Sequence, residues 1–269
     1  NDDDIRVILP VHFAGEPINM SELLFIAKKY DVFILEDCAH ALESVSNIGK
    51  VGDTDDAAAF SFYANKNITT GGEGGALATN DFDFSEKVRT MSLHGMSKTG
   101  WNRFKTNKKW MYDIVELGYK YNMTDISACF GIWQFNRLPK WEDRRLQIVK
   151  KYIDSISFIS GIICPKMITE EKHAWHLFII KIVSKEWTLT RNELINKLND
   201  FGIGTAVHYI PVHMQSYYKN KYNYKTDDFP VSKKLSDSVI SLPCFPAMKN
   251  EHVEYVINTI KELWDKYKK

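Results

Sequence analysis

Apolar residues in the first third of the chain gather in short continuous runs, and the segment between the first two runs shows helical spacing. Four such runs precede residue 80, at 6–10, 32–35, 57–62 and 76–79. A continuous rather than alternating apolar run is typical of a parallel strand covered on both faces. Residues 22–30 place apolar side chains on one helix face, with Asn19 or Ser21 as candidate N-cap. Strands that alternate with helices predict an α/β protein.

The later part of the chain is richer in predicted helices. These helices are expected at 85–93, 125–137, 139–152, 191–201 and 251–267. Thr124 is a plausible N-cap of the second, and residues 174–182 read as a strand. The last helix carries an apolar stripe that predicts core packing, made of Val253, Val256, Ile257, Ile260, Leu263, Trp264 and Tyr267. We therefore predict a large domain over residues 1–138, followed by a connecting helix and a smaller C-terminal α/β domain over 139–269.

The composition describes a globular protein with no strong electrostatic preference. Of 269 residues, 44% are hydrophobic and 26% charged, which suffices for a substantial core. Thirty-five basic and 34 acidic residues nearly cancel, so nucleic acid and anionic membranes are not expected partners. No apolar run approaches the length of a membrane span. The four cysteines form no close pair, which favours free thiols and a cytoplasmic location.

Candidate chemistry concentrates around two predicted strand ends. Asp37 follows the run at 32–35, Lys66 lies in a turn after the run at 57–62, and a glycine cluster follows at 71–75. Open α/β sheets bind ligands at the carboxyl ends of their strands. A lysine amine that can bind an aldehyde, and a carboxylate that keeps a pyridine nitrogen protonated, are the groups that pyridoxal 5′-phosphate (PLP) requires. We predict Lys66 and Asp37 as the catalytic pair, although either residue alone is more often a solvated charge.

Motifs of the same kind continue along nearly the whole chain. In order they are EDCAHA (36–41), GD (52–53), FSFYANK (60–66), GEGG (72–75), HGM (94–96), GYKYNMTD (118–125), HYIPVH (208–213) and LPCFP (242–246). Together they resemble the DegT/DnrJ/EryC1/StrS family of PLP-dependent sugar aminotransferases, a branch of the fold type I PLP enzymes. A series of matches in the right order is more specific than any single motif.

The resemblance implies a fold like that of aspartate aminotransferase, with a mostly parallel sheet in the large domain, and PLP as the cofactor. It implies that Lys66 holds PLP, that Asp37 faces the pyridine nitrogen and that Ser61 binds the phosphate. It also implies a hydrogen bond from His40 near the ring oxygen. From the residues alone, Ser61 could instead cap its turn, and His40 could be a buried histidine bonded to the backbone.

The resemblance further implies a homodimer, because the matching Asn122 reaches the PLP phosphate of the partner subunit and makes the active site composite. It suggests substrate-facing roles for His94 and His208. On sequence alone, Asn122 could equally be a turn residue, and His208 could be bonded within its own domain.

The family also carries an N-terminal portion ahead of the first predicted strand, with a Gly-Ser/Thr turn for the cofactor phosphate and an aromatic ring that stacks on PLP. Neither has a counterpart in this sequence. The run at 6–10 reads as a buried strand with nothing before it to pair with. We expect the chain to begin within a domain, either as a fragment or as a short version of the family.

The predicted activity is transfer of an amino group from L-glutamate to the keto-sugar of a nucleotide-sugar, for surface polysaccharide or another glycoconjugate. Relatives with histidine in place of the lysine deoxygenate their sugars, so Lys66 favours transamination. Two alternatives stay open. One is a non-catalytic or truncated member that acts as a binding or scaffold subunit, and the other is a cyclitol- or aminobenzoate-type relative with the same cofactor residues.

Two further features of the sequence suggest binding. Residues 97–112 interleave basic and aromatic side chains, so this segment is a candidate contact for the nucleotide-sugar, with RNA binding or a plain surface loop as alternatives. His173 and His176 could suggest a metal. On a strand their odd separation points them to opposite faces, so no metal site is assigned.

Overall fold

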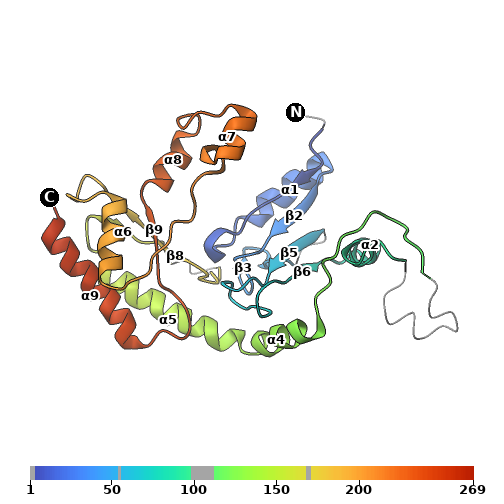
Figure 1. The fold of residues 1–269 in the computed structure, drawn as a ribbon, viewed down its shortest axis with the longest axis horizontal. Helices are drawn as coiled ribbons and strands as arrows, with labels where there is room; N and C mark the ends of the chain where they lie inside the picture. Colours follow the sequence, from blue (N-terminus) through green and yellow to red (C-terminus); the bar gives the residue numbers. More distant parts are fainter. Residues whose placement is uncertain (1–3, 54–55, 98–111, 168–170) are drawn as a thin grey trace. The chain divides into compact units, whose positions relative to one another are not determined.

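A computed structural model describes residues 4–53, 56–97, 112–167 and 171–269. These residues form two compact units, which are considered separately (Figure 1). The first unit holds the described residues of 1–138 together with 171–174, and the second holds 139–167 and 175–269.

The first unit is built on a four-stranded sheet with the order β1-β2-β5-β6. Its strands are β1 (Val7–Ile8), β2 (Phe33–Asp37), β5 (Ala57–Ser61) and β6 (Gly75–Ala78). β1 and β5 both pair with β2 in parallel, whereas β6 pairs with β5 in the antiparallel direction. The mixed α/β architecture with a mainly parallel sheet is confirmed, and the predicted strand boundaries shift by up to two residues.

The first predicted strand differs from expectation. Only Val7 and Ile8 pair, and the side chains of Val7 and Leu9 are 48% and 55% exposed. The expectation of a buried strand over 6–10 is therefore wrong for this structure. The physical reason is that β1 lies at the end of the strand order, so it has one hydrogen-bonded neighbour.

Helices and a small hairpin complete the described part of the first unit. They are η1 (Phe13–Gly15), α1 (Met20–Tyr30), α2 (Phe82–Ser92), α4 (Asp125–Phe135) and the hairpin of β3 (Val45–Ser46) with β4 (Gly49–Lys50). Thr124 caps α4 as predicted, because its hydroxyl oxygen accepts the N–H of Ser127 at 3.2 Å. Asn19 stands at the N-cap of α1, yet its side chain donates to Glu22 rather than accepting from the helix backbone.

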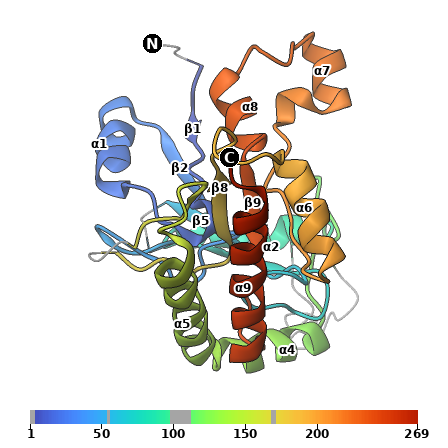
Figure 2. The same cartoon turned by 90° about the vertical axis from the view of Figure 1, so that its left-hand side faces the viewer.

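The second unit packs helices against a fully antiparallel sheet with the order β7-β8-β9. The strands are β7 (Ile162–Ile163), β8 (Phe178–Ile182) and β9 (Val239–Leu242). The helices are α5 (Leu138–Ile156, beginning at the last residue of the first unit), α6 (Arg191–Asp200), η2 (Val212–Met214), α7 (Ser216–Tyr222), α8 (Pro230–Ser236) and α9 (Asn250–Tyr267). α5 and α9 lie side by side (Figure 2), where Arg144 donates to the side chain of Asn250. None of the described helices has the length and apolarity needed to span a bilayer.

The apolar stripe of α9 forms part of the core of this unit, as predicted. Five of its side chains are buried, namely Val253, Val256, Ile257, Ile260 and Leu263, and Trp264 and Tyr267 pack against them partly buried. They share this core with Tyr152 of α5 and Phe178 of β8, whose rings lie 5.1 Å apart.

The strand predicted over 174–182 begins only at Phe178. Trp175 has φ +46°, a left-handed conformation that interrupts any extended run. His173 belongs to the first unit and His176 to the second, and neither lies in a strand. The two histidines do not share a strand, so the prediction that they point to opposite faces of one strand is wrong.

Gly161 offers a test of packing in the second unit. A Cβ at Gly161 would overlap the indole nitrogen of Trp187 and the ring of Trp264. Trp187 is 1% exposed and donates to the Gly161 carbonyl at 2.8 Å, so it has little freedom to move away. Gly161→Ala is expected to lower the free energy of unfolding by about 1–3 kcal/mol through overpacking. Urea unfolding followed by tryptophan fluorescence measures this change.

Gly204→Ala is the matched control, because a Cβ there meets nothing within 4 Å. Its urea midpoint should stay close to that of the original chain. Equal midpoints for the two variants would contradict the packing described around Trp187.

Candidate functional site

Two of the expected site residues lie at the same edge of the sheet in the first unit. β2 and β5 are parallel neighbours that end at Asp37 and Ser61, with Asp37 opposite Ala59 in the register. A pocket of about 230 Å³ opens at this edge. Its lining consists of Leu9, Leu35, Glu36, Asp37, Ala39, Ala59, Phe60 and Ser61. Parallel pairing therefore places a carboxylate and a hydroxyl where open α/β sheets bind their ligands.

The backbone and side chain of Asp37 are both fixed. Its Oδ1 accepts the N–H of Ala39 at 3.0 Å, which holds the carboxylate against the turn that follows β2. Its own N–H donates to the carbonyl of Pro10 at 2.8 Å, and its carbonyl accepts the N–H of His12 at 3.2 Å. The carboxylate is thus held in place before any ligand binds.

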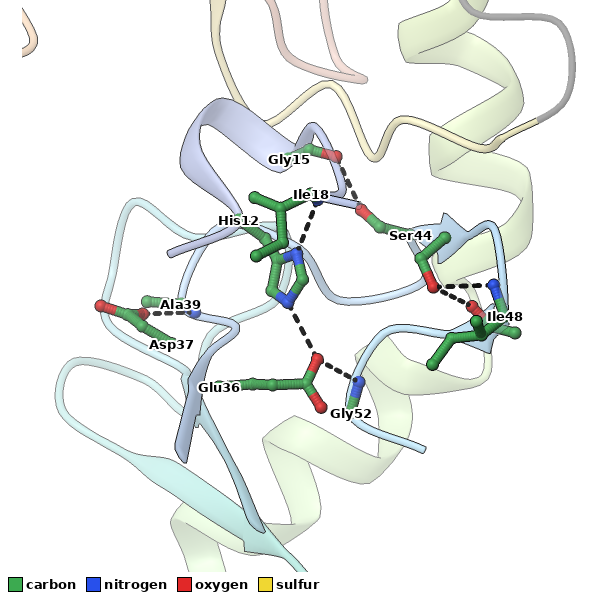
Figure 3. A network of polar contacts seen from close by, with 11 residues as sticks. His12, Gly15, Ile18, Glu36, Asp37, Ala39, Ser44, Ile48 and Gly52 are labelled. Carbon is green, nitrogen blue, oxygen red and sulfur yellow. Dashed lines mark hydrogen bonds and ion pairs between the residues drawn. The ribbon is translucent and has the colours of Figure 1, made fainter. Parts of the chain in front are cut away.

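Glu36, the neighbour of Asp37, makes a buried polar contact with His12 (Figure 3). Both side chains are fully buried, and Nε2 of His12 lies 2.9 Å from Oε2 of Glu36. Nδ1 of His12 accepts the N–H of Ile18 at 3.2 Å, so the ring proton sits on Nε2 and points at the carboxylate. Glu36 accepts a second N–H, from Gly52, at 3.2 Å.

The thiol of Cys38 lies within 4.8 Å of these His12 and Glu36 ligand atoms, so the three could in principle hold a metal ion. The hydrogen bonds favour a different interpretation. Metal binding through Nε2 would move the ring proton to Nδ1, where it would face the N–H of Ile18. Burial also raises the pKa of the Cys38 thiol, which opposes the thiolate that a metal needs. The group is best described as a buried hydrogen-bond network.

Lys66 lies in a turn that several hydrogen bonds hold. Its N–H donates to the carbonyl of Tyr63 at 3.0 Å. Further along, Gln134 of α4 clamps the backbone of Thr69 from both sides, accepting its N–H at 3.0 Å and donating to its carbonyl at 2.8 Å. The turn that carries Lys66 is therefore anchored at positions on both sides of the lysine.

The electrostatics of Lys66 connect it to Asp37. Burial lowers the pKa of the Lys66 amine from its usual range, and the negative charge of Asp37 acts in the opposite direction. The carboxylate therefore lies within electrostatic range of the amine. The described residues that line the 230 Å³ pocket do not include Lys66, which lies in the turn that follows β5. An amine with a lowered pKa is a better nucleophile towards an aldehyde.

His40 and Ser61 lie close to this pair in the sequence and have defined local contacts. His40 is 9% exposed, and its Nδ1 accepts the N–H of Ala14 at 3.1 Å, so its proton sits on Nε2. The Ser61 hydroxyl oxygen accepts the N–H of Tyr63 at 3.4 Å, which is consistent with the alternative prediction that Ser61 caps its turn. Neither contact excludes a ligand role, which stays a prediction for both residues.

The other three predicted site residues are not among the described lining of this pocket. Asn122 is exposed just before α4, and His94 is exposed with φ +59° at the end of α2. His208 belongs to the second unit, where its Nδ1 lies 2.7 Å from the hydroxyl of Ser241. Of the loop predicted to contact a nucleotide-sugar, residues 98–111 lie outside the described part of the chain.

His12 and Gln134 are not predicted from the sequence, and Glu36 enters the prediction only as part of a motif. Glu36 carried a usable signal, because a charged residue one position before Asp37 in a strand faces the opposite side of the sheet. His12 and Gln134 had no such signal. Their partners are 24 and 65 residues away in the chain, so only the tertiary structure pairs them.

Known proteins match most of this chain. A model of the DegT/DnrJ/EryC1/StrS aminotransferase family matches residues 3–261. The spore coat polysaccharide biosynthesis protein SpsC of Bacillus subtilis (strain 168) is 40% identical over 259 residues, which are 96% of this chain and 66% of SpsC. The chain thus spans about two thirds of the length of that relative.

Solved structures give the same result. Spr1654 of Streptococcus pneumoniae in its PMP form has a TM-score of 0.88 and 31% identity, covering 98% of this chain and 70% of that one. Spr1654 has also been solved in a PLP form. Helicobacter pylori PseC, an aminotransferase involved in the biosynthesis of pseudoaminic acid, has a TM-score of 0.87 and 26% identity, covering 97% and 67%. The expected fold type I architecture is confirmed, and the chain belongs to the DegT/DnrJ/EryC1/StrS aminotransferase family.

Proposed function

We propose that this chain carries the PLP-binding residues of a sugar aminotransferase. The observation that supports the proposal most directly is the partly buried Lys66 amine within electrostatic range of Asp37, beside the carboxyl ends of two parallel strands. PLP, when bound, supplies an aldehyde for the amine and a protonated ring that accepts electrons from the reacting carbon. The residues fit this group, because one offers a nucleophilic nitrogen and the other a carboxylate.

In the proposed mechanism these residues would hold PLP and move one proton. Lys66 would hold the cofactor through its Nζ, and the same nitrogen, once released, would accept and return the proton that transamination moves. The carboxylate of Asp37 would keep the pyridine nitrogen protonated. The Nε2–H of His40, available in the tautomer that the Ala14 N–H favours, would donate to the ring oxygen, and the Ser61 hydroxyl would bind the phosphate.

For the substrates, we propose L-glutamate as amino donor and the keto-sugar of a nucleotide-sugar as acceptor, with His94 and His208 facing the sugar. Two similar proteins support this proposal. SpsC is a spore coat polysaccharide biosynthesis protein, and PseC takes part in the biosynthesis of pseudoaminic acid. A cytoplasmic location is proposed with it, in keeping with four cysteines that are free thiols.

We further propose a homodimer in which Asn122 contributes to the site of the partner. α4, which begins three residues after Asn122, leaves large apolar side chains in water. Ile126 is 74% exposed, Phe130 54% and Trp133 53%. Contiguous exposed apolar surface of this kind is typical of protein interaction sites.

Replacing Lys66 should abolish covalent cofactor binding. With added PLP, the original chain is expected to gain a visible absorbance band that changes on addition of glutamate, and borohydride should fix the cofactor on Lys66. Lys66→Ala should show neither, because no amine remains at that position. Absorbance spectra and peptide mapping make the measurement. Lys87→Ala, an exposed lysine on α2, is the control and should behave like the original. A fixed cofactor in Lys66→Ala would refute the assignment.

The charge of Asp37 should control the titration of Lys66. Asp37 favours the ammonium form, so Asp37→Asn removes a stabilising charge and lowers the pKa of Lys66 further. The pH profile for labelling Lys66 with an amine-reactive reagent, read by mass spectrometry of the cofactor-free protein, should therefore move to lower pH. Asp53→Asn is the control and should leave the profile in place. A shift to higher pH for Asp37→Asn would contradict the electrostatic coupling.

A charge on α4 should weaken self-association. Phe130→Asp places a carboxylate on the exposed apolar surface and is expected to shift the protein towards monomer in sedimentation equilibrium, because a buried charge is costly at an interface. Phe82→Asp, at an exposed phenylalanine of α2 (73% against 54% for Phe130), is the control and should leave the association unchanged. Identical association of the two variants would argue against α4 as the dimer surface.

A further inference from the structure

A line of buried hydrogen bonds connects the segments that carry Asp37 and Lys66 within the first unit. It starts at Asp37, whose carbonyl accepts the N–H of His12 at 3.2 Å. The carbonyl of His12 in turn accepts the N–H of Gly15 at 3.3 Å. The turn at Phe13–Gly15 is thereby tied to the end of β2.

The line continues from Gly15 to the residue after Lys66. The carbonyl of Gly15 accepts the N–H of Ala174 at 3.0 Å and the hydroxyl of Ser44 at 2.7 Å. The carbonyl of Ala174 then accepts Nδ2 of Asn67 at 3.1 Å. Ser44, Ala174 and Asn67 are 0%, 1% and 6% exposed, so these bonds lie away from water.

Asn67 differs from most of the other members because it takes part through its side chain. Asparagine is usually exposed, and a buried amide is costly unless it is hydrogen-bonded. Its acceptor is 107 residues away in the chain, so the contact does not serve a local turn or cap. A buried, long-range side-chain bond directly beside a candidate catalytic lysine indicates a positioning role.

We propose that Asn67 is a positioning residue whose buried amide fixes Lys66 relative to Asp37. This inference rests on the proposed function, in which the two side chains act on different parts of one cofactor. Reactive groups need placement to a fraction of an ångström, which residues behind the site provide. Gln134 holds Thr69 independently, so the turn keeps an anchor when the Asn67 amide is removed.

Loss of the amide has a measurable consequence at Lys66. Burial is the larger influence on the pKa of Lys66, and the charge of Asp37 is the smaller, opposing one. When the hydrogen bond from the Asn67 amide to the carbonyl of Ala174 is removed, we expect the Lys66 side chain to move towards water and away from Asp37. Because the larger effect is lost, the pKa of Lys66 rises towards that of an ordinary lysine.

The test measures the rate of Lys66 labelling by an amine-reactive reagent across pH in the cofactor-free chain. Asn67→Ala should shift the profile to higher pH and lower the labelling rate at mildly alkaline pH, by on the order of threefold or more. Asn65→Ala is the matched control, because Asn65 flanks Lys66 on the other side and is exposed. Its profile should coincide with that of the original chain.

Labelling needs no cofactor, so this outcome is independent of whether PLP binds. An unchanged profile in folded Asn67→Ala, or equal shifts in both asparagine variants, would overturn the positioning role while leaving the proposed function untouched. If PLP fails to bind but the labelling profile shifts as expected, the proposed function is contradicted and the positioning role stands.

If Asn67→Ala does not fold, Asn67→Ser and Ser44→Ala are measured instead. Ser44→Ala removes one of the two anchors of Gly15, so a smaller shift in the same direction is expected, and unchanged profiles in both would overturn the role.

Discussion

The parallel pairing of β2 with β5 is the constraint from which the candidate site follows. Parallel neighbours end at the same edge of a sheet, so the last residues of the two strands lie close together. Here those ends are Asp37 and Ser61, and the turn that leaves β5 carries Lys66 five residues later. An antiparallel pair would have placed Asp37 and Ser61 at opposite ends of the sheet. The parallel direction of this strand pair thus brings the Asp37 carboxylate within electrostatic range of the Lys66 amine.

Buried polar contacts behind that edge make the arrangement rigid. The pairing of His12 with Glu36 removes a carboxylate and an imidazole from water completely, which is tolerable because each atom involved has a backbone or side-chain partner. Such networks specify one conformation, since any displacement leaves a buried polar atom unsatisfied. The same physical argument applies to the amide of Asn67. Precision at the edge of the sheet is therefore supplied in part by side chains such as those of His12 and Asn67, which do not line the pocket.

Two opposing effects, burial and the charge of Asp37, set the pKa of the Lys66 amine. Full burial would lower the pKa of the lysine strongly and leave a neutral amine. A fully exposed lysine beside Asp37 would keep a high pKa and remain an ammonium ion. The partly buried position combines both influences, with desolvation the stronger. An amine in this state can bind a carbonyl and can also carry a proton afterwards, which are the two tasks required of it in a transaminase.

The sequence by itself determined the family, the α/β class with a mainly parallel sheet, most helix positions and the cap at Thr124. These properties are written in local patterns, because apolar spacing, strand-like runs and ordered motifs are readable within short windows. Only the tertiary structure decided that the first strand is an exposed edge, that the segment before Phe178 bends at Trp175, and that His12, Gln134 and Asn67 find partners tens of residues away. Pairing over such distances depends on how whole elements pack, and a chain position carries no local sign of which distant carbonyl or carboxylate will lie beside it.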